Sequence, residues 1–280
     1  MEFKLGIFPV PDATDPAGTT ELMLVAERAG LDLLGVQDHP YQRRFFDTWT
    51  LLAYVAGRTE RIRLVPDVTN LPLRPPAMLA KAAASLDVLS GGRVELGLGA
   101  GAFWEGIEAM GGPRRTPRES VDALEEAIPI LRAFWDGERS VTAAGEHYRV
   151  RGARPGPPPA HRIGIWLGAY RPRMLELTGR LADGWLPSLG SYMGPDDALR
   201  MQRAIDEAAR RAGRRPEDVE RAVNLTQLDG SPGSWPDLLA RIVSELRFTT
   251  LIAGVPDTDR LGFVRRLGEE VAPRVRALLG

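Results

Sequence analysis

Short apolar runs alternate along this chain with longer segments of helical periodicity, and this alternation restricts the fold more than any other feature of the sequence. The apolar runs have the length and composition of buried strands, while the segments between them repeat apolar residues at three- and four-residue spacing. Strands that alternate with helices form a parallel sheet, because each helix returns the chain to the same end of the sheet. The pattern therefore predicts an α/β protein.

Eight such strand and helix units can be counted. The predicted strands span residues 4–8, 31–36, 62–65, 93–98, 162–167, 184–186, 219–225 and 248–252. Eight units in 280 residues, 44% of them hydrophobic, are typical of one (β/α)8 (TIM) barrel, so we expect a single domain over residues 1–280. A Rossmann-like open sheet is the alternative. It is disfavoured because the glycine-rich stretch 97–103 lacks the full G-x-G-x-x-G pattern.

Several helix boundaries can be predicted from local signals. Asp47 can cap one helix and Gly57 can end it, and Thr116 with Glu119 has the spacing of a capping box. Pro129 is expected to kink or shorten the helix that follows that box. Residues 136–161 change character after the fourth unit, to a short hairpin and a proline-rich connector, which we interpret as an excursion on the barrel.

One helical segment, which begins near Pro76, has apolar residues expected to share its buried face. They are Met78, Leu79, Ala82, Ala83, Leu86 and Leu89.

Composition excludes several classes of function. The net charge is -1 and the basic residues are scattered, so we expect no nucleic-acid partner. The chain has no cysteine, and its three histidines are dispersed without metal-binding spacing, so no metal site is expected. Neither a signal peptide nor an apolar run long enough to cross a bilayer is present, which predicts a cytoplasmic protein without a membrane partner.

Candidate site residues follow the predicted strands, since the active site of a (β/α)8 barrel lies at the carboxyl ends of its strands. His39 is the only histidine in such a position, and imidazole can exchange a proton near neutral pH. It could instead only fix the loop. Its neighbour Asp38 is assigned to structure first, because carboxylates in such loops often accept backbone N–H bonds. The other candidates follow strands three, four and five: Asp67, Val68, Asn70, Gly99, Ala100, Gly101, Ala102, Gly168, Ala169, Tyr170 and Arg171.

Four segments together resemble the bacterial luciferase-like monooxygenase family. They are D-H-P-Y after strand two, T-N-L-P-L-R-P-P-A-M-L-A-K, L-D-V-L-S-G-G-R-V-E-L-G-L-G-A-G, and G-A-Y-R-P-R-M-L-E-L-T-G-R-L-A-D-G-W. The resemblance implies a barrel that binds FMN or the 8-hydroxy-5-deazaflavin coenzyme (F-420) and oxidises, reduces or oxygenates a small organic substrate. It also implies a cis peptide bond at Asp67–Val68 behind the ring, a proton-transfer role for His39, and possible pairing into a homodimer.

The resemblance also implies that the loop Gly99–Ala102 and the segment Gly168–Arg171 contact the side chain and phosphate of the cofactor. The segment after strand five is closer to the deazaflavin enzymes, so F-420 is favoured over FMN. Ala102 stands where sugar-phosphate dehydrogenases of the family carry an acid, which makes a sugar phosphate a poor candidate substrate.

Three alternatives stay open. The first is an FMN-dependent monooxygenase, and the second is a flavin-binding barrel without turnover, an accessory or storage protein, which Ala102 would fit. The third is a cofactor-free hydrolase or isomerase, for which the sequence offers no second convergent acid or base.

Overall fold

A computed structural model describes residues 3–280 of the chain, and its centre is a barrel of short parallel strands. In order around the sheet, the strands are β3 (Arg63–Pro66), β2 (Leu33–Val36), β1 (Lys4–Phe8), β12 (Thr250–Gly254), β11 (Glu220–Leu225), β9 (Gly184–Trp185), β8 (Ile165–Leu167), β5 (Leu96–Gly99) and β4 (Thr69–Asn70). A further strand, β10 (Ser188–Leu189), pairs with β11. Every pair within this sheet is parallel, as predicted.

The sheet closes on itself at β3 and β5. A parallel bridge joins Leu64 of β3 to Val94, just before β5, and β4 continues the line of β3 after two residues. Because β10 likewise continues β9, the described strands occupy eight positions around the barrel. The predicted (β/α)8 barrel is confirmed, and the open Rossmann-like alternative is wrong.

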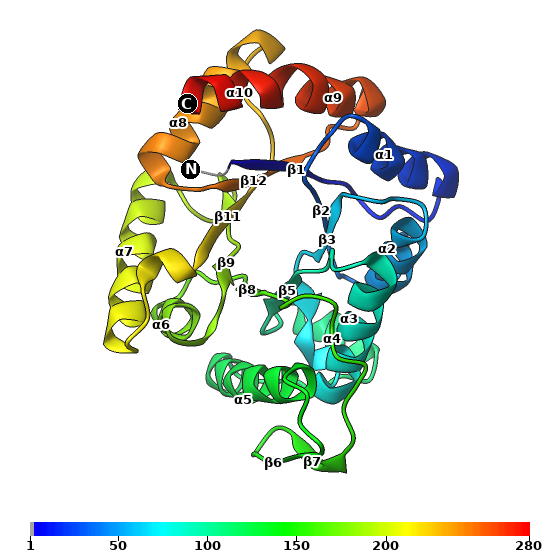
Figure 1. Ribbon diagram of the computed structural model, residues 1–280, viewed down its shortest axis with the longest axis vertical. Coiled ribbons are helices and arrows are strands. Elements are labelled where there is room, and N and C mark those ends of the chain that lie inside the picture. Colours follow the sequence, from blue (N-terminus) through cyan, green and yellow to red (C-terminus); the bar gives the residue numbers. More distant parts are fainter. Residues whose placement is uncertain (1–2) are drawn as a thin grey trace.

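The helices surround the strands (Figure 1). They are α1 (Pro16–Arg28), α2 (Thr48–Ala56), α3 (Pro76–Ser90), α4 (Trp104–Ala109), α5 (Pro117–Trp135), α6 (Pro172–Leu181), α7 (Pro195–Arg211), α8 (Trp235–Leu246), α9 (Arg260–Arg266) and α10 (Ala272–Leu279). None of the helices in residues 3–280 is both long and apolar enough to span a membrane.

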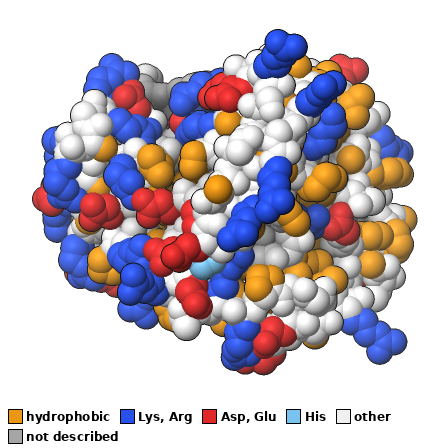
Figure 2. Space-filling view, turned by 90° about the horizontal axis from the view of Figure 1, so that it is seen from below, with side chains coloured by type: hydrophobic (Ala, Val, Ile, Leu, Met, Phe, Trp, Pro, Cys, Tyr) orange, Lys and Arg blue, Asp and Glu red, His pale blue; other side chains and the backbone are white. Residues whose placement is uncertain are grey.

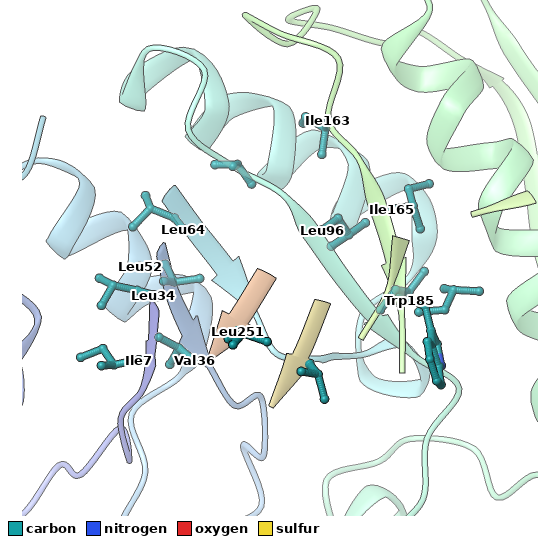
Figure 3. Close-up of a cluster of buried hydrophobic side chains, with 14 of the residues drawn as sticks. Ile7, Leu34, Val36, Leu52, Leu64, Leu96, Ile163, Ile165, Trp185 and Leu251 are labelled. Atoms are coloured by element: carbon teal, nitrogen blue, oxygen red, sulfur yellow. The ribbon is translucent and has the colours of Figure 1, made fainter. Parts of the chain in front are cut away.

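Alternation of side chains along the strands creates two apolar layers. Outward-facing residues such as Leu34 and Leu64 pack with Leu52 of α2 in the layer between strands and helices (Figure 3). Inward-facing residues fill the bore of the barrel. They are Leu33, Val65, Trp166, Leu186, Ala222 and Ile252. The filled bore confines any ligand to the ends of the barrel.

The predicted helix signals are mostly confirmed. The Asp47 carboxylate accepts the backbone N–H of Thr50 at 2.8 Å, and Thr116 with Glu119 forms the capping box of α5. The expected shortening at Pro129 is wrong, because α5 continues to Trp135. Buried residues on both sides of Pro129, including Ile128 and Ile130, hold the helix on the barrel despite the missing hydrogen bond.

The predicted excursion is present between α5 and β8. An antiparallel hairpin of β6 (Val141–Ala144) and β7 (Arg149–Ala153) lies outside the barrel, beyond α5 (Figure 1). The connector then returns past the amino-terminal end of the strands, where His161 Nδ1 lies 2.8 Å from the buried carboxylate of Asp87. The connector is therefore tied to the barrel wall.

The prediction of which residues form the buried face of α3 is partly wrong. Leu79, Ala83 and Leu86 are buried, whereas Met78 and Leu89 are 66% and 82% exposed and Ala82 is exposed as well. The two groups form adjacent stripes on the helix, and only the first faces the strands.

Elsewhere on the surface, charged side chains of both signs are interspersed with apolar ones (Figure 2).

Candidate active site

The predicted site residues lie in loops at the carboxyl ends of the strands, around one mouth of the barrel. The loop after β2 brings His39, the segment between β3 and β4 brings Asp67 and Val68, and the loops after β5 and β8 bring residues 99–102 and 168–171. These strands occupy neighbouring positions in the sheet. Residues that are far apart in sequence therefore meet at one end of the molecule.

A buried ion pair holds the loop that carries His39. Both oxygens of the Asp38 carboxylate, which is 1% exposed, accept hydrogen bonds from the Arg74 guanidinium at 2.8 Å. The Asp38 carboxylate also accepts the backbone N–H of Asn70 at 3.0 Å, and Arg74 continues to Asp47 at the start of α2. Asp38 is thus a structural residue, as predicted, and it fixes the position of its neighbour His39.

His39 is exposed at the mouth, but one side of its imidazole ring is covered. The ring stacks on Tyr41 with 5.5 Å between the centroids and an interplanar angle of 17°. This partial burial lowers the pKa of His39 below its usual 6.5, and the nearby charge of Asp38 opposes the shift. The imidazole is therefore mainly neutral at neutral pH and can accept a proton.

Two aromatic residues that we did not select from the sequence extend this surface. Tyr41 lies 5.1 Å, centroid to centroid, from Phe103, which follows the glycine-rich loop and is 50% exposed. His39, Tyr41 and Phe103 thus form a continuous row from the β2 loop to the β5 loop. Tyr41 was visible within D-H-P-Y, but its contact with Phe103 depends on the barrel geometry.

The peptide bond between Asp67 and Val68 is cis, as the resemblance implied. The Val68 side chain lies over the ends of β5 and β8. A Cβ atom at Gly99 would lie only 2.7 Å from Val68 Cγ2, and one at Gly168 would lie 3.4 Å from it. A Cβ at Gly97 would meet the backbone oxygen of Pro66 at 2.1 Å. Only glycine, which lacks a Cβ atom, allows residues 66–68 to approach β5 and β8 this closely. We call Asp67–Val68 the Val68 bulge. The sequence pattern alone did not reveal this contact.

The remaining predicted residues divide between the mouth and the core. Gly101 has φ of +96°, which glycine adopts readily, and Ala102 is exposed at the rim. Ala169 is buried in the core, and its carbonyl accepts a hydrogen bond from Trp185 Nε1 at 2.9 Å. Its side chain therefore does not face the mouth. Tyr170 Oη accepts the backbone N–H of Ser188 at 2.7 Å.

Arg171 and Ala100 complete the predicted set. Arg171 is exposed at the N-cap of α6, next to that helix's unpaired backbone N–H groups, and Ala100 is half-buried at the end of β5. An exposed guanidinium beside a helix N-terminus is a suitable partner for an anionic group.

A cavity of about 690 Å³ opens beside the His39 loop, between the loops after β1, β2 and β12. Its lining includes Val10, Phe45, Arg43, Val255 and Arg260. The cavity is large enough for a small organic molecule. The sequence did not reveal it, because its walls come from both ends of the chain.

Buried polar atoms at the mouth fit a ligand with a flat ring and a polar edge. The Thr69 hydroxyl and the side-chain carbonyl of Asn70 have no hydrogen-bond partner among residues 3–280. Such atoms are usually paired in folded proteins, either by protein groups or by bound molecules. Together with the glycines that surround Val68, they make the mouth suitable for the ring of a flavin or deazaflavin.

Comparisons with known proteins agree with this arrangement. The family model described as luciferase-like monooxygenase matches residues 3–228. An F-420-dependent glucose-6-phosphate dehydrogenase from Nocardia farcinica is 31% identical over 234 residues, which cover 80% of this chain and 68% of that protein.

Two further relatives extend the comparison. A phthiodiolone/phenolphthiodiolone dimycocerosates ketoreductase from Mycobacterium tuberculosis is 36% identical over 178 residues, 62% of this chain and 45% of that protein. The coenzyme F-420-dependent tetrahydromethanopterin reductase from Methanopyrus kandleri has the same fold, with a TM-score of 0.81 at 22% identity over 98% of this chain and 100% of that chain.

Proposed function

This chain belongs to the luciferase-like monooxygenase family, and from that premise we propose that it is an oxidoreductase that uses the deazaflavin coenzyme F-420. The observation that carries the proposal is the packing of Val68 against Gly99 and Gly168 at the ends of β5 and β8, in the same mouth of the barrel as His39. Val68 would support the ring, and the loops Gly99–Ala102 and Gly168–Arg171 would hold the remainder of the coenzyme. The relative from Nocardia farcinica is named as an F-420-dependent enzyme, which favours this coenzyme over FMN.

The proposed reaction interconverts an alcohol and a carbonyl compound. When bound, the coenzyme supplies two-electron hydride chemistry. The neutral imidazole of His39 accepts the hydroxyl proton of an alcohol as its C–H bond breaks, and returns that proton in the opposite direction. Stacking on Tyr41 and the Asp38–Arg74 pair orient the imidazole. The cavity beside the His39 loop would receive the substrate.

Gly99→Ala tests the proposed ring site. The added methyl group would displace Val68, whose Cγ2 would lie 2.7 Å away, so we expect the Kd for F-420 to rise at least tenfold while the fold is retained. Gly57→Ala is the matched control, because the nearest atom to its Cβ would be 3.8 Å away. Fluorescence titration measures both variants. Equal affinity in Gly99→Ala and the unaltered protein would place the ring elsewhere.

A barrel that binds the coenzyme without turnover is the second candidate function. It is favoured by Ala102, which is exposed at the rim where sugar-phosphate dehydrogenases of the family carry an acid. Measuring coenzyme reduction with a panel of alcohols distinguishes this accessory role from that of an oxidoreductase. Binding without reduction by any of them would support the accessory role.

We also propose that the chain forms a homodimer through the outer face of α2 and α3. Tyr54, Met78, Val88 and Leu89 expose apolar side chains there, between 44% and 82% of their surface. Leu89→Glu combined with Met78→Glu is expected to convert the dimer to a monomer in light scattering after gel filtration. Leu278→Glu, at an exposed position on α10, is the control. A monomeric unaltered protein would contradict the proposal.

A further inference from the structure

A hydrogen bond crosses the bore of the barrel directly beneath the mouth. Asp67, at the end of β3, accepts from Asn224 Nδ2 of β11 at 3.0 Å. Four steps around an eight-position barrel separate β3 from β11, so the two strands lie on opposite walls. The Asp67–Asn224 pair therefore forms a floor between the mouth above and the apolar filling of the bore below.

The second carboxyl oxygen of Asp67 lies in an apolar niche. Asp67 is 7% exposed, and its Oδ2 has no hydrogen-bond partner among the described residues. The niche exists because β2 carries Gly35, where a Cβ would lie 2.8 Å from this oxygen and 3.1 Å from Ile252 of β12. An ionised carboxylate in such surroundings would be poorly solvated.

No cation among the described residues pairs with this carboxylate. Arg74, which follows the turn 71–73 after β4, is committed to Asp38 and Asp47. The loop after β2 also carries His39, Tyr41 and two exposed arginines, Arg43 and Arg44. The β8 loop contributes Tyr170, while β11 contributes the neutral Asn224 and the inward face of β12 contributes Ile252. Burial raises the pKa of Asp67 to about 7, and the hydrogen bond from Asn224 only partly opposes this.

We propose that Asp67 is a positioning residue: its neutral carboxyl, tied to Asn224, holds the Val68 bulge against the ring, and loss of its proton weakens ring binding. Ionisation would place an uncompensated negative charge directly beneath the ring position and would draw water toward a dry floor. This inference rests on the proposed function for the identity of the ring. The protonation of Asp67 itself does not depend on it.

The first test uses the protein without coenzyme. A folded pKa near 7, above the ordinary Asp value of 3.8, means that Asp67 lowers stability progressively as pH rises from about 4 to 7. The Tm of Asp67→Asn minus that of the unaltered protein should therefore grow over this range and level off above pH 7. Asp136→Asn, an exposed residue, is the matched control. A difference that does not change with pH would overturn the proposal.

The second test follows coenzyme binding. The Kd for F-420 should rise several-fold between pH 6 and pH 8 in the unaltered protein, beyond the change seen in Asp67→Asn. The Kd of His39→Gln is measured over the same pH range, so that the part of the pH dependence that comes from His39 can be subtracted. The same pH dependence in Asp67→Asn would overturn the positioning role. Absence of F-420 binding at every pH, with the expected Tm difference, would instead refute the proposed function and leave the protonation of Asp67 established.

Discussion

His39→Gln is expected to lower kcat by a factor of about 10² to 10⁴ while the Kd for F-420 changes little. Glutamine can hydrogen-bond but cannot exchange a proton near neutral pH, and this range is typical for removal of a general acid or base. The measurement is coenzyme reduction by the alcohols that the unaltered protein oxidises, combined with fluorescence titration of binding. His147→Gln, in the hairpin outside the barrel, is the control.

The pH profile gives a second readout for His39. Its pKa lies below the usual 6.5, so alcohol oxidation by the unaltered protein should stay active at neutral pH and decline only as the imidazole becomes protonated at lower pH. That acidic limb should be absent from the residual activity of His39→Gln. An unchanged kcat in the variant would remove His39 from the mechanism and leave it only a role in fixing the loop.

Arg74→Gln is expected to destabilise the protein by about 3–5 kcal/mol. The substitution leaves the Asp38 carboxylate buried with one backbone hydrogen bond, and breaking a buried pair by removing one partner costs about this much. Urea unfolding measures the change. Arg74→Lys should lose less stability, because lysine keeps the positive charge, although it cannot form the bidentate hydrogen bonds of the guanidinium.

The double variant Asp38→Asn with Arg74→Gln serves as the internal control. It removes the carboxylate as well as its partner, so it should be more stable than Arg74→Gln alone. A loss below 1 kcal/mol in Arg74→Gln, or no recovery in the double variant, would show that this pair does not hold the His39 loop.

The sequence predicted the barrel well because each local signal agreed with the global fold. Strands and helices alternate with different periods, and capping residues such as Asp47 and Thr116 mark where helices begin. The position of His39 after a strand was enough to place it at the mouth. The cis bond came from the resemblance, since nothing in the residue types at Asp67–Val68 dictates it.

Features that depend on closure of the barrel could not be predicted. The Asp67–Asn224 contact joins residues 157 positions apart, and only the ring of strands brings them together. A polar Asn224 directly after the apolar Ala222 and Val223 was the available signal. On α3, periodicity showed apolar stripes but could not tell which one faces the strands, so Met78 and Leu89 were assigned wrongly to the core.

We propose that the mouth at Asp67–Val68 binds a deazaflavin ring. The most direct measurement is fluorescence titration of the purified protein with F-420 and, in parallel, with FMN. Saturable binding of F-420, tighter than that of FMN and weakened by Gly99→Ala, is the result we predict. Tighter binding of FMN would contradict the choice of coenzyme, and binding of neither would show that the mouth is not a flavin site.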